Sequence, residues 1–245
     1  MKCYGIIGYP LSHSFSKKYF TEKFLQDGIA GCVYEAYPIK AIDELTGLLK
    51  QNPGLLGLNI TIPYKQSIFQ FIDDTQNIPA GLKACNCIKI IAGKIIGYNT
   101  DITGFERSLL PLLNKHHTHA LVLGNGGAAE AIKFVLQKLK INYQIVSRQI
   151  QEGSHLTYTH LDEKIIKQNT LIINTTPLGS FPAVNEYPDI PYRFLTDRHL
   201  LFDLVYNPAK TLFLQKGEEQ GTAISNGYQM LVIQAAESWK IWNKD

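Results

Sequence analysis

A glycine-rich turn between an apolar run and a helix-like run constrains the fold of this chain most strongly. Residues 120–135 read ALVLGNGGAAEAIKFV, and the segment from Gly124 to Ala129 fits the pattern G-x-G-x-x-A. The first glycine permits a tight turn, the second lets backbone N–H groups approach a pyrophosphate, and the alanine lets the helix pack on the strand. The start of the helix also adds partial positive charge near the phosphates. The pattern predicts a dinucleotide-binding unit, and its alternative is a glycine turn used only for packing.

The end of the next predicted strand, 143–147, indicates which dinucleotide is bound. NAD sites usually carry an acidic residue there, about 20 residues after the glycines, that binds the ribose 2′-hydroxyl. This strand leads into Ser147-Arg148-Gln149, without an acid. Arg148 can pair with a 2′-phosphate and Ser147 can donate a hydrogen bond to it, so we expect NADP. Taken alone, Arg148 is an exposed arginine at a strand end.

Short apolar runs alternate with amphipathic runs along the 245 residues. In the first half we predict strands at 3–8, 32–39 and 56–62, helices at 14–28 and 41–51, and a hairpin at 87–98. In the second half we predict helices at 102–113, 128–140, 209–220 and 227–242, and strands at 120–124, 143–147, 170–174, 199–205 and 222–225. Strands that alternate with helices imply parallel βαβ units, so we predict an α/β fold.

The composition favours a globular protein with a small-molecule partner. Apolar residues make up 45% of the chain and the net charge is only +3, without a long basic run that would indicate a nucleic-acid-binding arm. No apolar run approaches the roughly 18 residues of a membrane span, and the N-terminal run is too short and interrupted for a signal peptide. Cys85 and Cys87 are too close for a Cys-x-x-Cys redox pair, so we expect reduced thiols in a cytoplasmic protein.

A histidine-rich stretch, NKHHTH at 114–119, precedes the strand at 120–124. A metal site would need a Cys or a carboxylate at ligand spacing, and none lies nearby. We therefore interpret the stretch as a solvated connector and predict no metal site.

Polar side chains of the first half occur where predicted elements end. They are Ser12, Ser14, Thr61, Lys65, Asn86 and the run Asn99-Thr100-Asp101. Because ligands of α/β sheets bind beyond the carboxyl ends of the strands, these side chains are candidates for one substrate site. Each also has a structural interpretation: Ser14 as a helix N-cap, Lys65 as a solvated lysine in a first helical turn, and Asp101 as a cap of the helix at 102–113.

Gln234 interrupts an apolar run, LVIQAA at 231–236. A buried amide without partners costs about 1–3 kcal/mol, so we expect this one to be satisfied. Its partner is either the backbone of the core or a substrate hydroxyl, and loss of such a hydroxyl partner is how a hydrogen-bonding site rejects analogues.

The ordered set of motifs resembles the shikimate dehydrogenase family between residues 5 and 236. The matching segments are SHS (12–14), NITIPYK (59–65), ACNCI (84–88), YNTD (98–101), GNGGAA (124–129), INTTPLG (173–179), FDLVYNPAKT (202–211) and GYQMLVIQAA (227–236). The chain departs from the family at Lys17 and Phe20, where Pro and His are common, at Cys87, which replaces Thr, and at Ser147-Arg148-Gln149, which replaces N-R-T.

The resemblance implies reversible reduction of 3-dehydroshikimate to shikimate with NADPH, a step of chorismate and aromatic amino acid biosynthesis. It implies that Lys65 and Asp101 form the catalytic pair, and which of them carries the proton stays open because paired groups titrate together. The implied substrate residues are Ser12, Ser14, Thr61, Asn86, Tyr206 and Gln234. The implied cofactor residues are Gly124, Asn125, Gly126, Gly127, Ala128, Ser147, Arg148, Thr175, Leu204 and Gly227.

The implied architecture has two α/β domains with a cleft between them. Residues 1–101 form a substrate-binding domain with a mainly parallel sheet, completed by the C-terminal helix 226–245, and residues 102–225 form a Rossmann-like NADP-binding domain. We expect a monomer or homodimer, with no nucleic-acid or membrane partner. Two other functions fit the sequence: a quinate/shikimate dehydrogenase that uses NAD, and a catalytically silent NADP-binding sensor.

Overall fold

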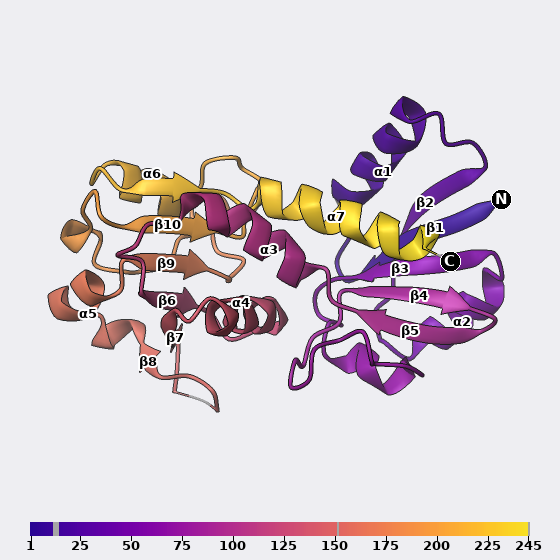
Figure 1. Cartoon of the computed structure of the whole chain (residues 1–245), viewed down its shortest axis with the longest axis horizontal. Helices are drawn as coiled ribbons and strands as arrows, with labels where there is room; N and C mark the ends of the chain where they lie inside the picture. Colours follow the sequence, from indigo (N-terminus) through magenta and orange to yellow (C-terminus); the bar gives the residue numbers. More distant parts are fainter. Residues whose placement is uncertain (12–14, 151, 245) are drawn as a thin grey trace. The chain divides into compact units, whose positions relative to one another are not determined.

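The computed structural model describes residues 1–11, 15–150 and 152–244 (Figure 1). Contacts divide the chain into two compact units, one formed by Met1–Thr103 with Gln234–Asp245 and the other by Gly104–Ile233. The division falls inside two helices, α3 (Asp101–Leu109) and α7 (Tyr228–Asn243). Each unit is built on one β-sheet.

The sheet of the first unit has the strand order β2-β1-β3-β4-β5. The strands are β1 (Lys2–Gly8), β2 (Cys32–Pro38), β3 (Leu55–Ile60), β4 (Cys87–Ile91) and β5 (Lys94–Tyr98). The first three are parallel to one another, whereas β4 pairs antiparallel with both β3 and β5. The strand order reverses beside β1, so the carboxyl ends of β1 and β3 flank a topological switch point, where ligands of α/β sheets bind.

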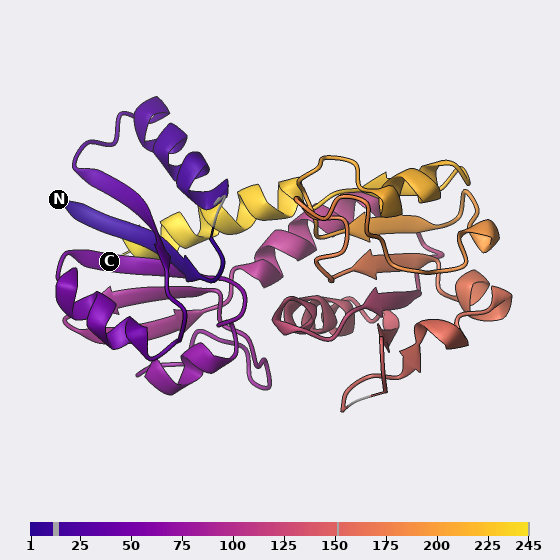
Figure 2. The same cartoon turned by 180° about the vertical axis from the view of Figure 1, so that it is seen from behind.

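Aromatic packing joins the first and last helices of this unit to its sheet. Phe20 of α1 (Phe15–Gln26) stacks on Tyr34 of β2, with ring centroids 4.4 Å apart. Trp242 of α7 stacks on Tyr4 of β1 at 5.0 Å. The face of the sheet that binds α7 is the rear one in Figure 2, and α2 (Glu44–Gln51) lies in front of the sheet in that view.

The close packing of α7 on β3 leads to a prediction about Gly57. A Cβ at Gly57 would lie 2.2 Å from Nε1 of Trp242, the atom that donates a hydrogen bond to the carbonyl of Ile88. Overpacking a core contact costs about 1–3 kcal/mol, so we expect Gly57→Ala to lower the free energy of unfolding by that amount. Denaturant unfolding measures it. In the control Gly47→Ala, within α2, the new methyl has open space and should stabilise the chain slightly; equal effects of the two changes would contradict this packing.

The sheet of the second unit is parallel throughout and has the order β11-β10-β9-β6-β7-β8. Its strands are β6 (His119–Leu123), β7 (Asn142–Ser147), β8 (Leu156–Thr157), β9 (Leu171–Asn174), β10 (Leu200–Asp203) and β11 (Ala223–Ser225). The chain proceeds outward from β6 to β8 and then returns to the other side of β6 as β9. The switch point of this sheet therefore lies between β6 and β9. The predicted α/β fold is confirmed in both units.

The helices of the second unit are short apart from the one that follows the glycine turn. They are α4 (Gly127–Lys138), α5 (Glu163–Gln168) and α6 (Leu212–Glu218), with the 3₁₀ segments η2 (Leu110–Leu112), η3 (Tyr158–His160) and η4 (Tyr192–Phe194). The elements β8, η3 and α5 were not predicted. Each is too short to show hydrophobic periodicity, and α5 is stabilised instead by the side chain of Asp162, which accepts a hydrogen bond from the amide of Ile165 at 2.8 Å.

Two sequence expectations are wrong in detail. The run after Thr61 does not begin a helix: residues 62–66 form a turn, and a 3₁₀ segment, η1 (Ser67–Phe71), follows it. The stretch 114–119 is not simply a solvated connector, because His117 is buried and burial lowers its pKa. The Nδ1 atom of His117 accepts a hydrogen bond from the amide of Asn114, so this histidine closes the loop before β6.

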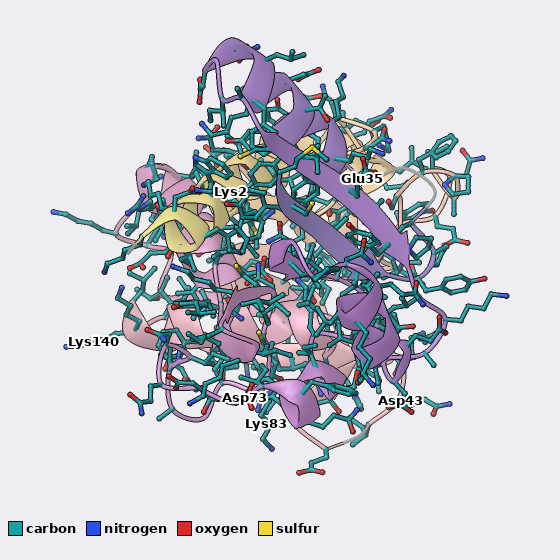
Figure 3. All side chains as sticks on the ribbon, turned by 90° about the vertical axis from the view of Figure 1, so that its right-hand side faces the viewer. Lys2, Glu35, Asp43, Asp73, Lys83 and Lys140 are labelled. Carbon is teal, nitrogen blue, oxygen red and sulfur yellow. The ribbon has the colours of Figure 1, made fainter. Side chains whose placement is uncertain are left out.

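The charges of the chain lie mostly at its surface. Figure 3 shows the charged residues Lys140, Asp43 and Lys83 at the edge of the molecule, and all three are exposed. Within the described residues, no group of three His, Cys, Asp or Glu side chains has a geometry that could hold a metal ion. A search of the same residues finds no helix that is both long and apolar enough to cross a membrane.

Candidate functional site

The turn at the carboxyl end of β3 fixes the backbone of Lys65. The amide of Tyr64 donates to the carbonyl of Thr61 at 2.9 Å, and the amide of Cys85 donates to the carbonyl of Lys65 at 2.8 Å. The buried side chain of Tyr64 anchors the turn further, because its hydroxyl donates to the carbonyl of Ile39 at 2.7 Å. Lys65 therefore extends from a rigid turn rather than from a solvated helix.

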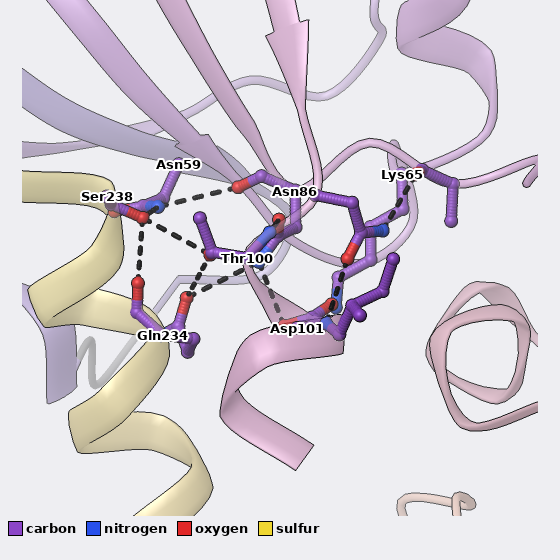
Figure 4. Close-up of polar contacts among 10 residues, drawn as sticks. Asn59, Lys65, Asn86, Thr100, Asp101, Gln234 and Ser238 are labelled. Carbon is purple, nitrogen blue, oxygen red and sulfur yellow. Dashed lines mark hydrogen bonds and ion pairs between the residues drawn. The ribbon is translucent and has the colours of Figure 1, made fainter. Parts of the chain in front are cut away.

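The side chain of Lys65 contacts Asp101, the first residue of α3. Its Nζ atom lies 2.6 Å from Oδ2 of Asp101 (Figure 4), and the side chains are only 16% and 8% exposed. Asp101 does not cap its helix, since Asn99 does so by accepting a hydrogen bond from the amide of Ile102 at 3.2 Å. Both oxygens of the Asp101 carboxylate are thus available to side chains.

Asn86 holds the second oxygen of that carboxylate. Its Nδ2 atom donates to Oδ1 of Asp101 at 2.9 Å and to Oγ1 of Thr100 at 2.9 Å, while its Oδ1 accepts from the backbone amide of Thr100 at 2.6 Å. The cysteines on either side of Asn86 are buried, and burial raises the pKa of Cys85 to about 11 and also raises the pKa of Cys87. These thiols therefore stay protonated at neutral pH and belong to the packing beneath the site.

Gln234 approaches the same group from α7. Its Oε1 atom lies 3.3 Å from Oγ1 of Thr100 and 3.4 Å from Nδ2 of Asn86. The sequence left two partners open for Gln234, the backbone of the core or a substrate hydroxyl. Its Oε1 atom contacts side chains and not the backbone. The structure thus brings four predicted site residues, Lys65, Asp101, Asn86 and Gln234, into one connected group within the first unit.

The structure describes two further predicted substrate residues, Thr61 and Tyr206, and neither belongs to this connected group. Thr61 begins the turn that carries Lys65, and its amide donates to the carbonyl of Ile7 at 3.0 Å, which places it beside the end of β1. Ser12 and Ser14 lie outside the described residues. Tyr206 belongs to the second unit, where it is half-buried and burial raises its pKa.

The glycine turn lies at the switch point of the second sheet, as the pattern predicts. Gly124 follows β6 with φ +104°, and a Cβ there would lie 2.8 Å from Oγ1 of Thr175, the first residue after β9. Gly126 precedes α4, whose first residue is Gly127, and a Cβ at Gly126 would meet open space. A positive φ, an open approach to the backbone and a helix start are the features that a pyrophosphate requires, so these residues fit a dinucleotide.

The two residues predicted to select the cofactor differ in their surroundings. Arg148 is exposed immediately after β7, and the segment 144–149 contains no acidic residue. Ser147 is buried, and its hydroxyl donates to the carbonyl of Gln149 at 2.5 Å. The guanidinium of Arg148 is therefore the group of this segment that is exposed for a 2′-phosphate.

A buried carboxylate, Asp203, fixes the loops after β9 and β10. It accepts hydrogen bonds from Nδ2 of Asn174 at 2.9 Å, the amide of Val205 at 3.0 Å and the hydroxyl of Thr211 at 2.6 Å. Burial nevertheless raises the pKa of Asp203 to about 6. These contacts hold two segments in place: the loop that begins at Thr175 after β9, and the loop from Leu204 to Thr211 between β10 and α6.

Thr175 and Leu204 begin these two loops, and Gly227, between β11 and α7, packs against Leu204. The amide of Leu204 donates to the carbonyl of Asn174 at 3.0 Å, and a Cβ at Gly227 would lie 2.1 Å from the carbonyl oxygen of Leu204. Glycine is thus required where the start of α7 touches this loop. The remaining predicted residues, Asn125 and Ala128, lie in the glycine turn and in the first turn of α4.

Sequence interpretation missed several polar residues of these networks. They are Asn59, Asn174, Asp203 and Ser238, all of which are buried. A signal was present for Asn59, Asn174 and Asp203, because they are polar residues of predicted strands, where an unpaired polar group is costly.

Comparison with known proteins agrees with this geometry. Residues 6–88 match the family model described as the shikimate dehydrogenase substrate binding domain. The shikimate dehydrogenase (NADP⁺) of Methanococcus maripaludis strain C6 is 34% identical over 98% of this chain and 91% of its own length. The crystal structure of the Thermus thermophilus enzyme with NADP(H) and shikimate has a TM-score of 0.87 and 25% identity, covering 99% of this chain and 94% of that one.

A third relative is a quinate dehydrogenase. The structure of the Corynebacterium glutamicum protein with NAD has a TM-score of 0.85 and 26% identity, covering 99% of this chain and 93% of that one. Taken with the fold and the site, these matches define the chain as an α/β oxidoreductase. The chain belongs to the shikimate dehydrogenase family, which confirms the resemblance seen in its sequence.

Proposed function

We propose that this chain reversibly reduces 3-dehydroshikimate to shikimate, with Lys65 and Asp101 as the catalytic pair. The contact between Nζ of Lys65 and Oδ2 of Asp101 at 2.6 Å carries the proposal. The cofactor is NADP, which supplies the hydride when it is bound as NADPH. The enzyme is thus a dehydrogenase that acts on a CH–OH group.

The chemistry of the pair follows from its charges. A carbonyl that accepts hydride develops negative charge on its oxygen, and an ammonium group within hydrogen-bond reach stabilises that charge and can donate the proton. The Nζ atom of Lys65 is the donor in this proposal. Asp101 orients the ammonium through Oδ2, and Asn86 prevents the carboxylate from turning by donating to Oδ1.

Neutral side chains recognise the substrate in this proposal, together with the carboxylate of the pair. The polar groups assigned to its hydroxyls are Thr61, Asn86, Asp101 and Gln234, and those assigned to its carboxylate are Ser12, Ser14 and Tyr206. Support comes from the connected group of Asn86, Asp101 and Gln234, which is largely enclosed, so an analogue that lacks a hydroxyl leaves one of these groups unpaired.

Three binding regions are assigned to the cofactor. The pyrophosphate is assigned to the turn formed by Gly124, Asn125, Gly126, Gly127 and Ala128. The 2′-phosphate is assigned to Arg148, and Ser147 contributes only when its hydroxyl turns away from the carbonyl of Gln149. Thr175, Leu204 and Gly227 are assigned to the nicotinamide side, since Thr175 follows β9, Leu204 follows β10, and Gly227, just before α7, packs on Leu204. These roles make residues 102–225 the NADP-binding domain, and 1–101 with 226–245 the substrate domain. Oligomeric state and cellular location stay predictions.

One assay tests the proposed function directly. The purified chain is mixed with shikimate and NADP⁺, and NADPH formation is followed by its absorbance, with quinate and NAD⁺ in parallel reactions. We expect NADPH formation that depends on shikimate. A clear preference for quinate with NAD⁺ would favour the quinate dehydrogenase alternative, and no turnover with any pair, despite NADP binding, would favour a catalytically silent sensor.

A further inference from the structure

A buried serine on α7 connects Gln234 with the sheet of the first unit. Ser238 is fully buried and lies one helical turn after Gln234. Its Oγ atom is 3.0 Å from the carbonyl oxygen of Gln234, 2.9 Å from Nδ2 of Asn59 and 3.3 Å from Oγ1 of Thr100 (Figure 4). One hydroxyl thus joins α7, β3 and the segment before α3.

The hydrogen positions around Ser238 follow from a fixed acceptor. Nδ2 of Asn59 also lies 3.4 Å from the backbone carbonyl of Asn86, which only accepts, so the nitrogen of the amide faces this side. Asn59 therefore donates to Ser238, and the single hydroxyl hydrogen of Ser238 is directed to the carbonyl of Gln234. The hydroxyl of Tyr34 completes the arrangement by donating to Oδ1 of Asn59 at 2.8 Å.

The orientation of the Gln234 amide follows from a fixed donor. The backbone amide of Thr100 can only donate, so the atom of Asn86 that it contacts at 2.6 Å is the oxygen. The amide nitrogen of Asn86 donates to Asp101 and Thr100 and also faces Gln234, so a Gln234 nitrogen at this place would set two donors against each other. Gln234 is thus held with Oε1 toward Asn86 and Thr100, and its Nε2 group has no hydrogen-bond partner among the described residues.

We propose that Ser238, held by Asn59, is a positioning residue that fixes Gln234 so that its Nε2 group donates to a substrate hydroxyl oxygen. Ser238 sets the position of the Gln234 backbone by its hydrogen bond to the carbonyl, and it limits the side chain through Thr100. The proposal rests on the proposed function. It adds the direction of one hydrogen bond, in which Gln234 is the donor and a hydroxyl oxygen of the substrate ring is the acceptor.

The test compares Ser238→Ala with Ser108→Ala in steady-state kinetics. Ser108 is also a buried serine that donates to its own helix, at 3.0 Å to the carbonyl of Phe105, but it forms no hydrogen bond with Gln234. We expect Ser238→Ala to raise the KM for shikimate about tenfold, the effect of one lost hydrogen bond. The KM for NADP⁺ and kcat should be unchanged, and Ser108→Ala should change none of the three constants.

A double-mutant cycle with Gln234→Ala separates positioning from general damage. If Ser238 acts through Gln234, Ser238→Ala adds little to the KM for shikimate once Gln234 is alanine. Additive effects, or equal changes in the KM values of shikimate and NADP⁺, would overturn the proposal. Ser238→Cys provides a second substitution at this position. If neither Ser238→Ala nor Ser238→Cys folds, the role of Ser238 is purely structural and the proposal is overturned. Absence of turnover in the unmodified chain would instead refute the proposed function.

Discussion

Replacement of Lys65 by alanine is expected to lower kcat for shikimate oxidation by about 10²–10³-fold, the effect of removing one preorganised donor to a developing oxyanion. The ammonium group lies 2.6 Å from Asp101 and is largely buried, so water does not readily replace it. The KM for shikimate should change much less, because the hydroxyl-binding groups stay in place. Steady-state kinetics with purified protein measures both constants.

Lys83→Ala is the matched control for this change. Lys83 belongs to the same unit and is exposed, so its loss should leave kcat unaltered. Circular dichroism should show that both variants are folded. Near-normal turnover of Lys65→Ala would exclude Lys65 as a catalytic residue, and Asp101 would be the next side chain to substitute.

The second large effect is expected at Arg148. Substitution of Arg148 by alanine should raise the KM for NADP⁺ by about 10–100-fold, since hydrogen bonds to charged groups contribute about 1.5–3 kcal/mol. The KM for NAD⁺, which lacks the 2′-phosphate, should stay nearly the same. The measurement is the ratio of kcat/KM values for the two cofactors at saturating shikimate.

Arg198→Ala serves as the control for cofactor selection. Arg198 is also exposed in the second unit, but it precedes β10 and so lies at the opposite end of the parallel sheet from Arg148. Its substitution should leave the cofactor ratio unchanged. Equal losses with NADP⁺ and NAD⁺ in Arg148→Ala would exclude a 2′-phosphate contact, and the cofactor preference would then need another source.

The sequence predicts those parts of this molecule in which local pattern and tertiary structure agree. The glycine turn is predictable because Gly124 must adopt a positive φ and the strand and helix beside it have clear hydrophobic patterns. The hairpin of β4 and β5 is predictable for the same reason, since Ala92 and Gly93 both have positive φ at its turn. Both signals are local and do not depend on distant residues.

Long-range polar contacts were beyond such a prediction. Thr100 and Ser238 are 138 residues apart in the sequence, and nothing in either segment indicates that their hydroxyls meet. The run after Pro63 was interpreted as helix-like, with Lys65 in a first helical turn. In the structure the hydroxyl of Tyr64 instead donates to the carbonyl of Ile39, a contact from outside the segment that anchors a turn.

The capping of α3 by Asn99 separates two properties that one residue often combines. The first helical turn is stabilised by an amide oxygen that carries no charge, whereas the carboxylate of Asp101 faces Lys65 and Asn86. The hydrogen bond that caps the helix therefore does not depend on the carboxylate at position 101. The side chain proposed to take part in the proton transfer is separate from the side chain that holds the start of its helix.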